Sequence, residues 1–322
     1  MTYRLPEYRH TACGQERRLG VELEFNGLPL SRLAELVAEQ LNGQLRQQSE
    51  YEIEIDTPLG TFRAELDFDY LKRLARVQLK KPPGELEQAA TELLGTLAFQ
   101  LVPLELVSPP LPLSQLDQLT PLFERLRANG AKGTRHALHY AFGLHLNPEL
   151  PDTDANTLLR YFKAYLCLHD WLAQREDIVA ARKLSPYIRG FANDYCRRVI
   201  DLDYWPDLPQ FSDDYLAANP SRNRSLDLLP ILAWHDEARV QRVVQDDKVN
   251  KRPTLHYRLP NSDIDNPNWS LNHAWSGWLQ VEMLANDERR LKQVCRHYAE
   301  HLDRLTPDFL DPWANKVTPW LR

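Results

Sequence analysis

The feature that most constrains the fold is an alternation of apolar and acidic residues in short segments of the chain. In the clearest example, Glu22 and Glu24 alternate with the apolar residues Val21, Leu23 and Phe25. Successive side chains of a β-strand point to opposite faces, so this pattern predicts a strand with one apolar face and one acidic face. The two glutamates would lie about 7 Å apart. Like charges on one strand face repel each other, so exposure to water alone is a weak explanation for this face.

Similar patterns predict the remaining elements. Besides this first strand at 19–26, short apolar or alternating runs predict strands at 51–57, 61–68, 101–107, 136–146 and 253–259. Apolar residues spaced by three and four predict helices at 31–41, 84–98, 116–128, 154–175, 275–286 and 287–305. Many Asp, Asn and Pro residues interrupt the chain between 201 and 225.

This order of elements predicts an α+β fold, with a mainly antiparallel sheet and helices packed on one face. A length of 322 residues bounds the chain at one large or two modest domains, and we expect a single domain over 1–322. Its strand-rich half, 1–175, carries most of the acidic strand residues. Its mostly helical half, 176–322, contributes the late strand at 253–259.

Composition and missing motifs exclude several classes of function. The chain has 39 Lys and Arg against 45 Asp and Glu, a net charge of -6, which argues against a general nucleic-acid binder. It contains no GxGxxG, GxxxxGK[ST], GxSxG or HExxH motif. No signal peptide is evident at the N-terminus, and prolines interrupt the most apolar region, at 93–116. The four cysteines are scattered, so we expect a cytoplasmic protein with no membrane span.

The polar columns of the strands predict a metal site. Glu105 is the only charge in the apolar run 101–107, where burial would raise the pKa of its carboxyl unless a cation compensates. Several acids converging with a histidine such as His145 on one concave face suit Mg²⁺ or Mn²⁺. Both ions take hard oxygen ligands, and Mn²⁺ tolerates imidazole better. A face that only contacts water is the alternative, and we favour it for the acids at 52–56.

Several segments of the chain resemble the motifs of a known family. Residues 18–25 are similar to the RxGxExEF strand of the amidoligases, carboxylate–amine ligases with the catalytic fold of glutamine synthetase and glutamate–cysteine ligase. Further segments resemble the family's motifs in the same order. They are 64–67 (the acidic second element), 104–110 (E-L-V-S-P-P), 143–147 (GxHxH), 222–229 (RxxxLN) and 254–258 (TxExR). The resemblance spans roughly residues 17–285.

The resemblance implies a ligase that uses ATP. In such enzymes ATP phosphorylates a carboxylate, and an amine then attacks the acyl phosphate to give an amide, ADP and phosphate. Mg²⁺ or Mn²⁺ ions bridge the phosphates, because phosphoryl transfer depends on positioning and charge neutralisation. By this resemblance, one ion near the substrate carboxylate would be held by Glu24, Glu105 and Asp67. Another, across the ATP phosphates, would be held by Glu22, His145 and His256.

The resemblance also implies roles for basic residues. Arg258 would contact the ATP phosphates and the transferred phosphoryl group, because a guanidinium group matches a planar anion with several oxygens. Arg224 or Arg222 would orient a substrate carboxylate or phosphate. Lys183 lies in a basic stretch that could meet ATP. Surface ion pairing or a solvated helix face is the alternative for these residues.

Three positions depart from the family's motifs. Asn147 replaces the second histidine of GxHxH, His256 replaces the glutamate of TxExR, and Asp227 replaces the asparagine of RxxxLN. These departures leave open a catalytically degenerate relative that binds nucleotide or a partner protein. Metal-dependent amide hydrolysis without ATP is a third possibility. For a ligase, the substrates would be small-molecule or peptide carboxylates and amines, and no feature selects their identity or an oligomeric state.

Overall fold

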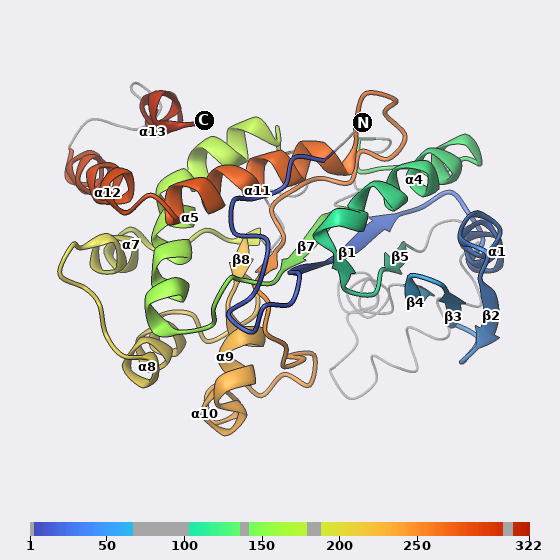
Figure 1. The fold of residues 1–322 in the computed structure, drawn as a ribbon, viewed down its shortest axis with the longest axis horizontal. Helices are drawn as coiled ribbons and strands as arrows, with labels where there is room; N and C mark the ends of the chain where they lie inside the picture. Colours follow the sequence, from blue (N-terminus) through green and yellow to red (C-terminus); the bar gives the residue numbers. More distant parts are fainter. Residues whose placement is uncertain (1–2, 67–102, 136–141, 179–187, 305–311) are drawn as a thin grey trace, which may run out of the picture.

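The structure is a computed structural model that describes residues 3–66, 103–135, 142–178, 188–304 and 312–322 (Figure 1). Its described strands form one nine-stranded sheet in which every pairing is antiparallel. The order is β2-β3-β4-β5-β1-β7-β9-β8, and β6 pairs with β1. The strands are β1 (Arg18–Phe25), β2 (Gln44–Gln47), β3 (Glu52–Thr57), β4 (Gly60–Leu66), β5 (Leu104–Val107), β6 (Leu111–Pro112), β7 (Leu144–Pro148), β8 (Leu226–Asp227) and β9 (His256–Tyr257).

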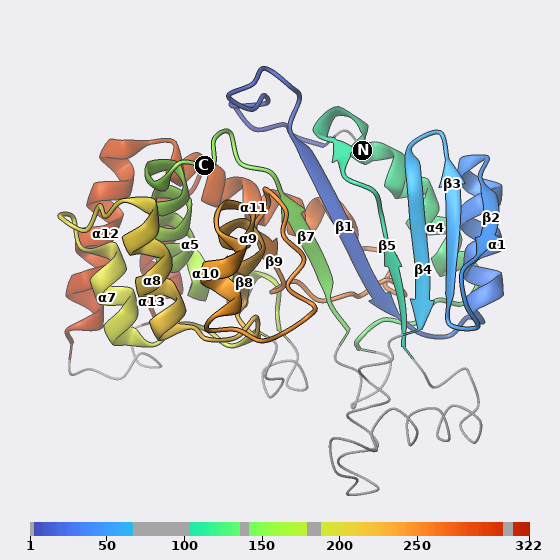
Figure 2. The same cartoon turned by 90° about the horizontal axis from the view of Figure 1, so that it is seen from below.

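Helices pack behind the sheet and at one end of it. Figure 2 shows α1 and α4 behind the strands β3, β4 and β5, whereas α5, α7, α8 and α12 gather at the end away from β2. Among the described residues, no helix combines the length and apolar character needed to cross a membrane. The helices are α1 (Leu30–Leu41), α4 (Leu119–Ala128), α5 (Ala155–Arg175), α7 (Asn193–Ile200), α8 (Leu208–Ala218), α9 (Leu229–His235), α10 (Glu237–Gln241), α11 (Leu271–Ala285), α12 (Glu288–Leu302) and α13 (Trp313–Val317), with 3-10 turns at Leu113–Gln118 and Thr318–Trp320.

The alternation in β1 decides which face of the sheet is buried. The apolar residues of this strand are at most 2% exposed, whereas Glu22 and Glu24 remain partly exposed on the opposite face. Helix α1 packs on β3 and β4. At the other end of the sheet, the ring centroids of Tyr257 in β9 and Trp278 in α11 lie 5.4 Å apart. The apolar columns therefore form the core, and the predicted combination of a mainly antiparallel sheet with helices is confirmed.

Most predicted elements appear, with shifted ends. Those with a clear counterpart are β1, β3, β4, β5, α1, α4, α5, α11 and α12. The strand predicted at 136–146 is observed as β7, Leu144–Pro148, and residues 136–141 lie outside the described residues. The helix predicted at 84–98 also lies outside them.

One prediction about the second half was wrong in extent. The strand predicted at 253–259 is only two residues long. Pro253 has no N–H to donate, and after Tyr257 the Arg258 N–H donates to the carbonyl of Ser225, which lies outside the strands, at 2.9 Å. Helix α8 lies in the segment that its Asp and Pro residues marked as interrupted. Asp207 accepts a hydrogen bond from the Gln210 backbone N–H at 2.9 Å and caps α8, so a residue interpreted as a breaker starts the helix.

A buried ion pair joins the start of β1 to α11. Arg17, 1% exposed, donates from both terminal nitrogens to the Glu282 carboxylate at 2.6 and 2.8 Å. Arg17 also donates to the backbone carbonyls of Tyr8 and Glu149 at 2.7 and 2.8 Å. Paired carboxylate and guanidinium groups of this geometry hold two elements in one orientation. The strand that carries Glu22 is thereby anchored to the helical layer.

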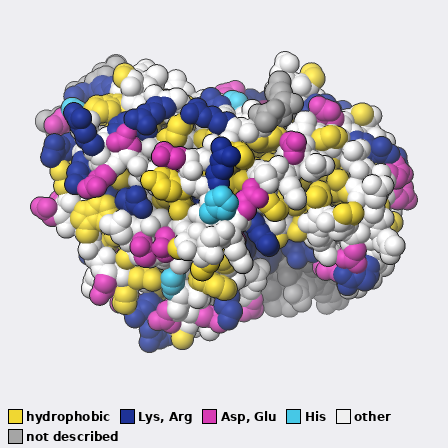
Figure 3. Space-filling view, viewed as in Figure 1, with side chains coloured by type: hydrophobic (Ala, Val, Ile, Leu, Met, Phe, Trp, Pro, Cys, Tyr) yellow, Lys and Arg dark blue, Asp and Glu magenta, His cyan; other side chains and the backbone are white. Residues whose placement is uncertain are grey.

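Charged side chains of both signs are interspersed over the face in Figure 3. Apolar side chains appear between them in small groups.

Candidate metal and substrate site

Acidic and imidazole side chains from four strands meet on the open face of the sheet. In the antiparallel register, Glu24 of β1 lies directly opposite Glu105 of β5, and Glu22 of β1 lies opposite His145 of β7. His256 comes from β9, which pairs with β7. The register of the sheet therefore brings together five predicted site residues from both halves of the chain.

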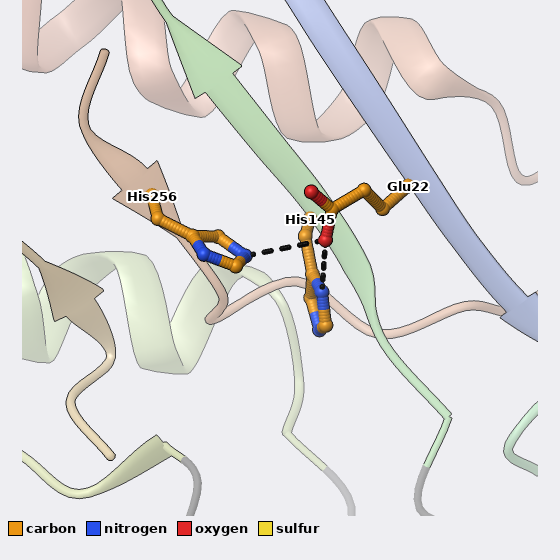
Figure 4. Close-up of side chains that lie close together, drawn as sticks. All are labelled: Glu22, His145 and His256. Atoms are coloured by element: carbon orange, nitrogen blue, oxygen red, sulfur yellow. Dashed lines mark hydrogen bonds and ion pairs between the residues drawn. The ribbon is translucent and has the colours of Figure 1, made fainter. Parts of the chain in front are cut away.

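Hydrogen-bond donors surround Glu22. Its Oε2 atom lies 3.2 Å from His145 Nδ1 and 3.4 Å from His256 Nε2 (Figure 4). Asn147 donates from Nδ2 to the other oxygen, Oε1, at 2.8 Å. Asn147 lies opposite Gly20, where a Cβ would come within 3.3 Å of the Asn147 side chain. The glycine therefore leaves room for the amide to reach across β1 to Glu22.

A second group of donor atoms adjoins the first. Glu24, Glu105 and His145 each offer one ligand atom, all within 4.8 Å of one another. The Gly143 backbone N–H donates to Glu24 Oε2 at 2.7 Å and orients this carboxylate, whose Oε1 lies 3.7 Å from His145 Nε2. An equally compact group consists of Glu22, His145 and His256.

Two guanidinium groups face the Nδ1 atom of His256. The Nη2 atoms of Arg258 and Arg252 lie 3.2 and 3.4 Å from His256 Nδ1. Arg252 Nη2 also donates to Asn147 Oδ1 at 2.7 Å, and Arg258 Nη2 lies 3.6 Å from Asp227 Oδ2. The side chain of Arg252 is 29% exposed and that of Arg258 only 6%, so Arg252 is the more accessible cation.

Burial and neighbouring charges set the protonation of this group. Burial by itself would raise the pKa of the Glu22 carboxyl, but the imidazoles of His256 and His145 lower it well below its usual range. Burial, and then repulsion from Arg258, holds the pKa of His256 well below its usual range despite the attraction of Glu22. This environment favours an ionised Glu22 beside a neutral His256.

The donor set suits a hard divalent cation. Carboxylate oxygens with one imidazole are ligands that Mg²⁺ and, more readily, Mn²⁺ accept. Glu105 lies directly opposite both Glu24 and Glu65 of β4, and like charges in this arrangement destabilise a sheet. Arg63 pairs with Glu65 at 2.8 Å. A cation bound between Glu24 and Glu105 would reduce the repulsion between these two carboxylates.

The strands that carry the candidate site lie within a match to a known family. Residues 15–280 match the sequence model of a family described as "putative amidoligase enzyme", and the match covers most of the chain. This chain belongs to that amidoligase family. No curated protein matches it. The matched residues include every strand that contributes to the candidate site.

The three departures from the amidoligase motifs lie close together. Asp227 of β8 is 2% exposed and lies opposite His256 of β9. Arg258 contacts both of them, while Arg252 contacts His256 and Asn147. The altered positions therefore belong to one connected polar network beside Glu22.

The remaining predicted residues are placed elsewhere or not described. Arg224 donates from Nε to Asn219 Oδ1 at 2.7 Å, and Arg222 Nε lies 3.3 Å from Asp246 Oδ2. These contacts join both arginines to residues outside the two groups of candidate ligands. Asp67 and Lys183, the last two predicted site residues, lie outside the described residues.

Sequence reasoning missed Arg252. The residue shares the period-two column of Thr254, His256 and Arg258, so extending the predicted strand by one residue toward the N-terminus would have included it. Its Nε atom donates to Thr254 Oγ1 at 3.2 Å, which holds the guanidinium group beside the candidate site.

Proposed function

We propose that this amidoligase is an ATP- and divalent-metal-dependent ligase that joins a carboxylate to an amine through an acyl-phosphate intermediate, on a catalytic fold like that of glutamine synthetase. The observation that carries the proposal is the facing pair Glu24 and Glu105 beside His145, on the open face of an antiparallel sheet. Family membership supplies the ligase chemistry, and the facing carboxylates supply a reason for a cation.

The chain's own residues would bind and orient the cation. Glu24, Glu105 and His145 would hold Mg²⁺ or Mn²⁺, and Asp67 is proposed as a further ligand. The Gly143 N–H keeps the Glu24 carboxylate in place. A bound ion of this kind neutralises phosphate oxygens and so favours phosphoryl transfer.

Basic residues would form the anion-binding side of the site. Arg252 and Arg258, whose Nη2 atoms both face His256, would bind the transferred phosphoryl group. Burial raises the pKa of Asp227, and the charge of Arg222 offsets a small part of that rise, which supports a place for Arg222 on the same side. Basic residues proposed to orient ATP or the acid substrate are Arg222, Arg224 and Lys183. The substrates would be a small-molecule or peptide carboxylate and an amine.

Phosphate release tests this function. The chain would be incubated with ATP, Mg²⁺ or Mn²⁺ and a pool of amino acids, and phosphate would be measured with and without the amines. We expect release that depends on both metal and amine. Glu24→Ala and Glu105→Ala should reduce it by about 100-fold or more, because loss of a bound ion removes several kcal/mol of charge stabilisation.

A matched control separates the site from the sheet as a whole. Glu54 projects from β3 and pairs with the surface residue Arg46 at 2.7 Å, so Glu54→Gln should retain full release. If ATP raises the melting temperature but no pool yields phosphate, a nucleotide-binding relative without catalysis replaces the proposal. Amide hydrolysis that needs metal but no ATP would also replace it.

A further inference from the structure

Two guanidinium groups determine which nitrogen of His256 carries the proton. Guanidinium groups only donate, so Arg252 Nη2 and Arg258 Nη2 require a lone pair on His256 Nδ1. In a neutral imidazole the proton then lies on Nε2. Nε2 is buried, makes no hydrogen bond of good geometry, and faces Glu22 Oε2 at 3.4 Å. A metal ion needs a lone pair at that atom, and this tautomer does not offer one.

His145 has the opposite arrangement. Its Nδ1 lies 3.2 Å from Glu22 Oε2, an acceptor, so Nδ1 carries the proton. The lone pair of Nε2 then faces Glu24, whose Oε1 lies 3.7 Å away. A carboxylate that accepts the proton of one ring nitrogen while the other nitrogen binds metal is a recurrent arrangement in metal sites.

Glu22 already has donors at both carboxylate oxygens. Asn147 donates to Oε1 at 2.8 Å, and the imidazoles of His145 and His256 face Oε2. Arg252 Nη2 adds a positive charge 3.7 Å from Oε1. A cation beside this carboxylate would have to displace these donors and approach a guanidinium group.

We infer that His256 does not ligate an ion but presents its Nε2–H to Glu22, and that the ion is bound by Glu24, Glu105 and Nε2 of His145. Glu22 is then a positioning residue that orients His145. Arg258 orients His256 in addition to its proposed contact with the phosphoryl group. This inference rests on the proposed function. It differs from the ligand set implied by the family resemblance, in which Glu22 and His256 help to hold a second ion.

Mn²⁺ alone is a suitable probe, because electron spin echo spectroscopy of the bound ion detects directly coordinated nitrogen. The whole chain would be titrated with Mn²⁺, and the number of coordinated imidazoles would be measured. We expect one. His145→Gln should remove the nitrogen coupling and weaken Mn²⁺ binding by about 10-fold or more. His256→Gln is the matched control, because glutamine can accept from the arginines and donate to Glu22; it should keep the coupling and change affinity by less than about threefold.

The outcomes separate this inference from the function on which it rests. Two coordinated imidazoles in the unaltered chain, or loss of the coupling in His256→Gln, would overturn the inference and leave a metal-dependent enzyme in place. If the unaltered chain binds no Mn²⁺ at millimolar concentration, both the inference and the proposed function fail. Should His145→Gln not fold, the number of imidazoles bound to Mn²⁺ in the unaltered chain still decides whether His256 is a ligand.

Discussion

The carboxyl of Asp227 should make the protein less stable as the pH rises. This side chain is buried in β8, with Arg258 Nη2 3.6 Å from Oδ2 and the Leu229 backbone N–H donating to Oδ1 at 2.9 Å. Burial raises its pKa from the ordinary 3.8 to about 6, although Arg258 and the Leu229 N–H lower it in part. The folded chain therefore holds this proton more tightly than the unfolded chain does.

The sign and size of the effect follow from that difference. Between pH 3.8 and about 6 the unfolded chain has lost the proton and the folded chain has kept it, so the free energy of unfolding falls as the pH rises. The stabilisation is complete below the unfolded pKa and is lost above the folded one. It amounts to about 3 kcal/mol in total, of which about 2 kcal/mol is lost between about pH 4.5 and about pH 7.5.

Urea unfolding of the unaltered chain and of Asp227→Asn tests this reasoning. Asparagine approximates the protonated carboxyl, so the stability of the unaltered chain relative to the variant should fall by about 2 kcal/mol across that pH range. Asp303→Asn, at a side chain that is 69% exposed, serves as the control and should show no such change. A relative stability of Asp227→Asn that stays constant with pH would refute the assigned burial of an ionisable carboxyl.

Three further predictions concern the fold around the site. Glu282→Gln should lower the free energy of unfolding by about 3–5 kcal/mol, because it leaves the Arg17 charge buried without a counter-charge; a loss under about 1 kcal/mol in urea unfolding would contradict this. Asp154→Ala should cost about 1 kcal/mol by removing the cap that accepts from the Thr157 N–H at 2.6 Å, and Asp154→Asn should recover most of that loss in the same assay. A thiol reagent should label one cysteine, Cys13, rapidly in the folded chain; rapid reaction of more than one thiol would be inconsistent with the burial of Cys167, Cys196 and Cys295.

The strand faces were predictable from the sequence because side-chain direction in a strand is a local property. The alternation around Glu22 and Glu24 places both on one face whatever the strand pairs with. Glu105, the only charge in the apolar run 101–107, was likewise identified as a candidate site residue from its local sequence. Helix α5 was also predictable, because its apolar spacing and its Asp154 cap lie within the segment itself.

Which residues meet across strands was decided only by the tertiary structure. Strand register depends on packing and on loops far apart in the chain, so no local pattern places Glu24 opposite Glu105 or His145 opposite Glu22. The same holds for Arg252, whose position beside His256 follows from the way a short β9 joins the sheet. Local periodicity thus determined which side chains face the open side of the sheet. Long-range pairing determined their partners, and a hydrogen bond or metal site requires two or more groups at a defined distance.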